Sequence, residues 1–149
     1  MYGDWTVNLA VVAVSLCAVA GCVLTHYEGL SLTSRGLAQL PGAHRRIKVL
    51  YAISSVLLLH VLEIWIFGLV MWVLLLAWPA CGSIGASAQH LFDYIYFSAI
   101  TYTTVGFGDL APLGPIRFLS GTEALTGFLL IAWSASFTYL EMERYWRPV

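Results

Sequence analysis

Long apolar runs constrain this chain more than any other feature of its sequence. No charged residue lies in residues 5–25, which would measure roughly 30 Å as a helix. A second run, residues 49–78, is interrupted by one histidine and one glutamate and would measure roughly 45 Å. About 20 apolar residues suffice to cross a bilayer as a helix. The sequence therefore predicts an integral membrane protein.

The composition argues against other classes of protein and partner. Of the 149 residues, 60% are hydrophobic and 10% are charged, and a net charge of -1 offers no basic field for nucleic acid. Cys17 and Cys22 lie in an apolar segment and Cys81 stands alone, so neither a metal-binding spacing nor a disulfide framework emerges. We expect the lipid bilayer as a partner, and neither nucleic acid nor an organic cofactor.

The first apolar segment is expected to remain in the mature protein. Its Val19–Cys22 sequence is similar to a lipoprotein processing site. However, a secretory signal carries positive charge before its apolar stretch, and the first four residues supply only Asp4. We therefore predict a transmembrane helix here.

The apolar runs and the polar segments between them divide the chain into three parts. We expect residues 1–26 to form a peripheral transmembrane helix, 27–48 a basic cytoplasmic loop, and 49–149 a larger module. The module is expected to contain an outer helix at 49–78, a short re-entrant helix at 90–104, a glycine-rich segment at 104–109 and an inner helix at 116–141. The predicted fold is all-α, with three transmembrane helices and one re-entrant helix.

Basic residues predict the orientation of these helices. The segment between the first two helices contains the helix breakers Pro41 and Gly42 and the basic residues Arg35, Arg45, Arg46 and Lys48. Arg144 and Arg147 follow the last helix. Because basic residues accumulate on the cytoplasmic side, we expect the N-terminus outside and the C-terminus in the cytoplasm, in a plasma or inner cell membrane.

The segment Thr104–Gly108 has a composition suited to holding a dehydrated cation. Irregular backbone at membrane depth leaves carbonyl groups unpaired, at a cost of several kcal/mol each. A K+ ion supplies the missing partner when a ring of carbonyls and the threonine hydroxyl replaces its hydration shell. Gly106 and Gly108 permit the left-handed steps that aim successive carbonyls at one axis, and Val105 and Phe107 then point outward.

These residues resemble a known family signature. The segment Thr103–Asp109 is similar to the signature of the potassium-channel superfamily, and residues 92–103 resemble its pore helix. The resemblance covers about residues 65–139 and is strongest to short bacterial channels without a cytoplasmic domain. It implies K+ ions, and no other metal, in a filter formed by Thr104, Val105, Gly106, Phe107 and Gly108. Since one chain supplies one filter strand, the resemblance also implies a homotetramer.

The residues around the filter depart from the commonest family pattern. The resemblance implies filter support by Thr103, Asp109, Phe97 and Tyr96. Phe107 lacks the hydroxyl of the usual tyrosine, Phe97 stands where an indole donor is common, and Ile100 replaces an acid. We therefore expect apolar packing to replace the hydrogen-bonded cuff around the filter.

The inner helix offers candidates for a hinge and a pore lining. Gly127 lies near the position of a hinge glycine in similar channels, and close helix packing explains it equally well. Phe128, Ile131, Ala135 and Tyr139 share one helix face and are candidates for the lining of the lower pore.

Three ionisable residues within the apolar runs are candidate regulatory residues. His60 and Glu63 lie three residues apart and therefore share one helix face. They are predicted to form either a proton-sensitive site or a polar clasp between helices. Glu123 is a candidate partner for the Thr101 or Tyr102 hydroxyl, its own helix or another subunit. A metal site joining the first pair to His26 and Glu28 is disfavoured, since the two pairs are expected at different depths.

The sequence leaves several functions in competition. The leading prediction is passive, potassium-selective conduction by a homotetramer. The alternatives are a nonselective cation channel, a nonconducting modulatory membrane subunit and, from a third class, an intramembrane metal hydrolase using His60 and Glu63. No helix carries arginine at every third position, so we expect no voltage sensor of the usual kind.

Overall fold

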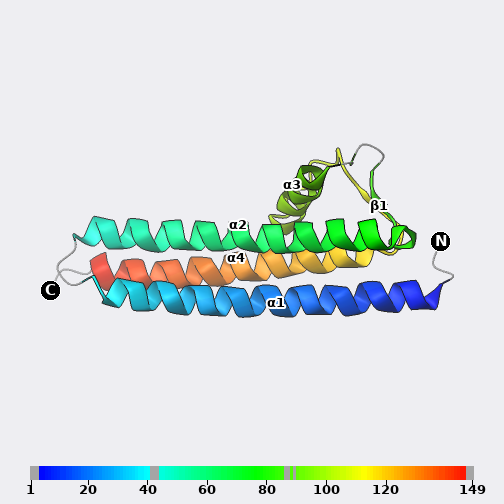
Figure 1. The fold of residues 1–149 in the computed structure, drawn as a ribbon. Coiled ribbons are helices and arrows are strands. Elements are labelled where there is room, and N and C mark those ends of the chain that lie inside the picture. The colour runs from blue at the N-terminus through cyan, green and yellow to red at the C-terminus, as the bar shows by residue number, and fades with distance from the viewer. Residues whose placement is uncertain (1–3, 41–43, 86–87, 89, 147–149) are drawn as a thin grey trace.

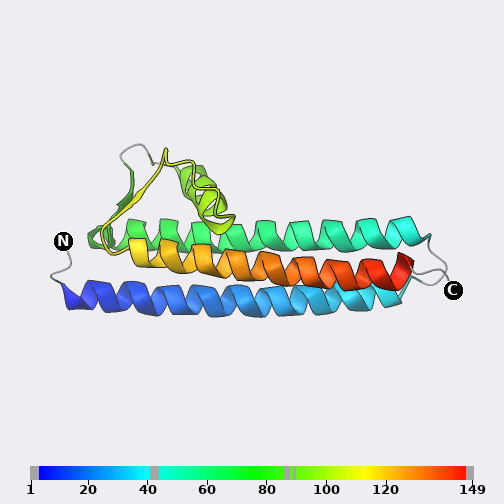
Figure 2. The ribbon, with the colours of Figure 1, turned by 180° about the vertical axis from the view of Figure 1, so that it is seen from behind.

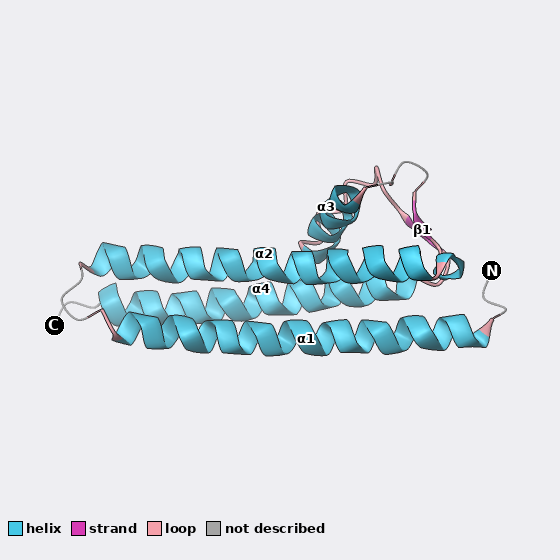
Figure 3. Ribbon diagram, in the orientation of Figure 1, coloured by secondary structure: helices cyan, strands magenta, loops and turns pink. Residues whose placement is uncertain are grey.

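The computed structural model describes residues 4–40, 44–85, 88 and 90–146. Three long helices lie side by side in Figure 1: α1 (Trp5–Ala38), α2 (Arg45–Ala77) and α4 (Arg117–Trp146). Helix α3 (Leu91–Tyr102) is short and inclined against α2. The three long helices are each long and apolar enough to cross a membrane. The predicted all-α membrane fold with three spanning helices is therefore confirmed, and helix dominates the view in Figure 3.

The three long helices form a bundle in which each contacts the other two. Figures 1 and 2, seen from opposite sides, agree that α4 lies along the groove between α1 and α2. The end of α1, the start of α2 and the end of α4 share one end of the bundle, and the start of α1 lies at the other. The bounds of α2, α3 and α4 fall within about five residues of the predicted ones.

Helix α1 is longer than the sequence predicts, and the prediction of a loop is wrong for residues 27–38, which are helical. The helix has 34 residues and ends at Ala38. Its buried positions continue at helical spacing beyond residue 25, through Cys22, His26, Leu30, Thr33 and Leu37. Glu28, the first charged residue after the predicted helix, is exposed on the other face. Contact with the neighbouring helices thus maintains the helix past its first charge. Pro41, Gly42 and Arg147 lie outside the described residues.

Short elements connect α2 to the region around α3. A 3-10 turn, η1 (Pro79–Cys81), leads into β1 (Ser83–Ile84), which pairs antiparallel with β2 (Pro112–Leu113). The Ile116 amide donates a hydrogen bond of 2.8 Å to the Cys81 carbonyl. The segment before α3 and the segment after the glycine-rich loop are therefore tied together at the start of α4.

Two glycines allow α3 to approach the long helices closely. A β-carbon on Gly68 of α2 would lie 3.0 Å from the Cα of Ile95, in the first half of α3. A β-carbon on Gly127 of α4 would overlap the carbonyl of Tyr102, the last residue of α3. Helix α3 thus rests against positions without a side chain near its middle and at its C-terminal end.

The outward faces of the long helices are apolar. Exposed side chains include Leu16, Leu24, Leu57, Leu58 and Leu76, each at least 60% exposed in the single chain. Such a surface is stable against lipid or against other membrane helices and would be unfavourable in water.

Candidate functional site

The backbone of the segment after α3 alternates in handedness. Thr104, Gly106 and Gly108 have positive φ angles of 60°, 54° and 83°. A β-carbon on either glycine would have no neighbour within 4 Å, so conformation and not space requires glycine here. The structure thus has the left-handed steps that the sequence predicts at both glycines. It adds one at Thr104, which nothing in the sequence indicated.

Hydrogen bonds fasten this segment to the end of α3. The Gly106 amide donates to the Ile100 carbonyl at 3.0 Å, and the Thr104 amide to the Thr101 carbonyl at 2.9 Å. The Thr103 hydroxyl donates to the Ala99 carbonyl at 2.7 Å. The irregular segment is therefore anchored to the helix that precedes it, as an ordered binding site requires.

The outer end of the segment is held by one phenol. The Tyr96 hydroxyl donates a hydrogen bond of 2.8 Å to Oδ2 of Asp109. This bond, together with the negative charge of Asp109, raises the pKa of the Tyr96 phenol above its ordinary value. The expectation that apolar packing alone replaces the cuff is therefore wrong. Phe97 is buried, as expected, but its neighbour Tyr96 supplies a hydrogen bond.

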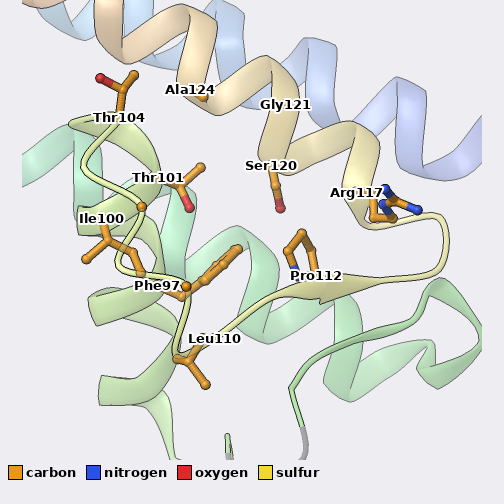
Figure 4. A pocket seen from close by; sticks show the side chains of 12 residues that line it. Phe97, Ile100, Thr101, Thr104, Leu110, Pro112, Arg117, Ser120, Gly121 and Ala124 are labelled. Atoms are coloured by element: carbon orange, nitrogen blue, oxygen red, sulfur yellow. The ribbon is translucent and has the colours of Figure 1, made fainter.

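A groove of about 440 Å³ separates the segment from the first turns of α4. Figure 4 shows Thr101 and Thr104 on one side and Ser120, Gly121 and Ala124 on the other. Gly106 and Gly108 also line it. Val105 and Phe107 are 55% and 71% exposed in the single chain. Two large apolar side chains beside the groove are thus uncovered in the single chain.

Glu123 is buried behind α3, and its partner in the single chain is Ser98. The Ser98 hydroxyl lies 2.5 Å from Oε1 of Glu123 and 2.8 Å from the Ile64 carbonyl. Neither the Thr101 nor the Tyr102 hydroxyl, which the sequence suggested, has a recorded bond to Glu123. The other carboxyl oxygen of Glu123, Oε2, has no partner among the described residues. This acid therefore links α4 to α3 through a serine that sequence analysis did not single out.

The inner helix has an uncovered face. The predicted lining residues are all exposed in the single chain: Phe128, Ile131, Ala135 and Tyr139. Gly127, beside them, is buried against the end of α3. Its position supports the close-packing alternative, because a side chain there has no room.

The module formed by α2, α3 and α4 matches a known family. Residues 49–142 match the family described as ion channel. The chain belongs to the ion channel family. Ion channels are not a class of enzymes, and the match confirms the predicted membership at the level of the family.

Two curated proteins show how far the similarity to known ion channels extends. The inward rectifier potassium channel Kirbac3.1 of Paramagnetospirillum magnetotacticum is 39% identical over 72 residues, which is 46% of this chain and 24% of that protein. Protein LctB of Geobacillus stearothermophilus is 33% identical over 60 residues, 40% of this chain and 45% of that protein. The aligned regions thus span less than half of these relatives. No solved structure matches the chain significantly.

A buried polar cluster joins this ion-channel module to α1, which precedes the matched region. We call it the intramembrane cluster; its members are His26, His60, Glu63, Tyr102 and Ser134. Nδ1 of His26 lies 2.8 Å from Oε1 of Glu63, and Nδ1 of His60 lies 3.0 Å from Oε2. The Tyr102 hydroxyl donates to the same Oε2 and lies 2.9 Å from His60 Nδ1. Nε2 of His26 lies 3.3 Å from the Ser134 hydroxyl.

The cluster corrects the expected depth of His26. The prediction that His26 lies at a different depth from His60 and Glu63 is wrong, because α1 continues for twelve residues beyond His26. The helix therefore places His26 level with the middle of α2. Glu28 does not join the cluster and is exposed. The contacts connect four helices, as the clasp alternative for His60 and Glu63 requires; a regulatory role for these two residues and for Glu123 stays a prediction.

Proposed function

We propose that this member of the ion channel family conducts K+ passively and selectively as a homotetramer. The observation that carries the proposal is the alternation of left-handed residues at Thr104, Gly106 and Gly108. Such a backbone can turn successive carbonyls toward one axis. Carbonyls at membrane depth need a partner, and a ring of them replaces the hydration shell of K+.

The single chain supports the tetramer because its filter segment is incomplete alone. One strand supplies one quarter of a carbonyl ring. Val105 and Phe107, exposed in the single chain, become wall residues once neighbouring chains surround the filter. Four copies also bring four uncovered α4 faces together around one path.

Further observations support the proposed preference for K+ and the proposed orientation of the chain in the membrane. Kirbac3.1, a potassium channel by name, shares 39% identity over 72 residues. The C-terminal end of each α3 turns the negative end of its helix dipole toward the site, which favours a cation. Arg45, Arg46 and Lys48 begin α2 at the end of the bundle where α4 finishes, so this end faces the cytoplasm and α1 starts outside.

Reconstitution of the purified chain tests the proposal. In liposomes we expect K+ flux, in planar bilayers a reversal potential that follows the K+ gradient and not the Na+ gradient, and by native mass measurement four chains per particle. Gly106→Ala should abolish K+ flux, because a β-carbon in a left-handed conformation costs roughly 1–2 kcal/mol in each subunit.

Gly21→Ala is the matched control for this substitution. Gly21 lies in α1, has no neighbour within 4 Å of an added β-carbon and has no positive φ. The control should conduct like the wild type. A folded tetramer that passes Na+ as readily as K+ would establish a nonselective cation channel instead. A folded protein without current would establish a nonconducting modulatory subunit.

A further inference from the structure

The intramembrane cluster has the composition of a metal centre. We propose that His26, His60 and Glu63 bind one divalent transition-metal ion of the zinc class, deep in the membrane and outside the ion path. The inference concerns a site separate from the filter, and it holds whether or not the protein conducts.

The three ligand atoms converge on one point. One ring nitrogen of His26, one ring nitrogen of His60 and one carboxylate oxygen of Glu63 all lie within 4.8 Å of one another. Zinc bonds to imidazole and carboxylate measure about 2.0–2.2 Å, which places the ligands of a tetrahedral ion roughly 3.3 Å apart. The present N···O separations of 2.8 and 3.0 Å require only small side-chain movements to reach that spacing.

The ligand types select the class of ion. Two imidazoles and one carboxylate form a mixed nitrogen and oxygen set, which suits Zn2+ and its transition-metal neighbours. Mg2+, Ca2+ and K+ prefer shells of oxygen ligands, which this site does not provide. Three protein ligands leave a fourth position open, and the Tyr102 hydroxyl stands beside it.

Neighbouring groups orient the ligands as they do in metal sites. A ligating imidazole usually hydrogen-bonds through its other nitrogen, which fixes the ring and its tautomer. Nε2 of His26 has such a contact, 3.3 Å from the Ser134 hydroxyl. Glu63 is held by Tyr102, on a third helix. The site is thus supported by residues beyond its three ligands.

The burial of the cluster favours a bound cation, because water cannot solvate the carboxylate there. The side chains of His26 and Glu63 are 0% exposed and that of His60 is 16% exposed. A carboxylate at this depth is costly unless a positive charge compensates it. A metal ion supplies that charge and at the same time occupies all three ligand atoms. A shared proton, the competing occupant, bridges one nitrogen and one oxygen at a time.

The ligands come from two helices, which gives the site a structural consequence. His60 and Glu63 lie three residues apart on α2, and His26 lies on α1. A bound ion therefore fastens α1 to the channel module by coordinate bonds. Tyr102 is the last residue of α3, directly before Thr103, so the ion would sit behind the base of the filter segment.

Metal binding to the full-length protein in detergent tests the site. After treatment with a chelator and removal of the chelator, Zn2+ titration should give one ion per chain, and Co2+ should show the intense visible bands of a tetrahedral site. Zn2+ should also raise the melting temperature. His26→Ala and His60→Ala should each weaken Zn2+ binding by more than about 100-fold, and Ser134→Ala by roughly 10- to 100-fold.

Two exposed residues provide the matched control. The double variant His44→Ala and Glu28→Gln removes one imidazole and one carboxylate outside the cluster and should bind Zn2+ like the wild type. The proposal is overturned if folded wild-type protein binds neither Zn2+ nor Co2+. It is also overturned if the double variant loses binding while His26→Ala retains it. If one ligand variant folds poorly, the other ligand variant decides whether Zn2+ binds at the cluster.

Discussion

The phenol of Tyr96 donates a hydrogen bond of 2.8 Å to Oδ2 of Asp109, across thirteen residues of sequence. The bond spans the whole filter segment, because Tyr96 lies on α3 before it and Asp109 follows it. It therefore restrains the outer end of the filter, where Phe107 has no hydroxyl to form another bond.

Tyr96→Phe should destabilise the conducting form of the filter. We expect K+ selectivity to persist and current to decline several-fold faster during sustained conduction, since the outer end of the filter loses its restraint. Current recordings from reconstituted protein measure the decline. Tyr94→Phe, which removes a phenol from the same helix away from Asp109, is the control. Equal decline in both variants would contradict a specific role for the bond.

The same bond predicts a dependence of stability on alkaline pH. The pKa of Tyr96 is raised in the folded protein above its ordinary value of 10.0. The contribution of this residue is thus fully present below pH 10 and is lost as the pH rises through the folded-state pKa. Melting temperatures of wild type and Tyr96→Phe should converge above that pH. A constant difference between the two melting temperatures up to strongly alkaline pH would contradict a contribution of the Tyr96 hydrogen bond to stability.

Gly127→Ala should disturb the end of α3. The added β-carbon overlaps the Tyr102 carbonyl, and we expect a loss of roughly 1–3 kcal/mol of stability from overpacking. Thermal unfolding measures it, with Gly21→Ala as control. A hinge role predicts a different result, in which stability is unchanged and only the fraction of time spent open falls.

Ser98→Ala should be costly because it removes a hydrogen-bond partner from a buried carboxyl group. Oε1 of Glu123 loses the serine hydroxyl, and we expect a loss of about 1–3 kcal/mol of stability. Glu123→Gln should cost less, since an amide still bonds to the serine. Both are measured by thermal unfolding in detergent.

Ser136→Ala is the control for this pair. Ser136 is exposed on α4, and its hydroxyl donates a hydrogen bond to the Ala132 carbonyl of the same helix. Its removal should change stability by less than about 0.5 kcal/mol. If Ser98→Ala is equally mild, the bond to Glu123 contributes little to the fold.

The left-handed backbone at Gly106 and Gly108 was predictable because its requirements are local. Left-handed backbone needs glycine, and Gly106 and Gly108 stand at alternate positions directly after an apolar helix too short to span a membrane. Thr104 escaped prediction because its positive φ comes from anchoring to α3, which residue type does not encode.

The intramembrane cluster was not predictable from the same reasoning. A charged residue such as Glu28 usually indicates the end of a spanning helix, and only packing against α2 and α4 shows that α1 continues. The period of the apolar residues was the usable signal, since burial recurs from Cys22 through His26 to Leu30. The pairing of Ser98 with Glu123 depends on how α3 crosses α4, which the linear sequence does not state.

Gly68 and Gly127, which contact α3, determine the position of the segment that follows this helix. Two methyl groups, absent at Gly68 and Gly127, set how near α3 lies to the helices behind it. In the proposed tetramer, a methyl at either position would displace every α3 from the helices behind it. The position of the proposed filter would then depend on two residues that lie outside it.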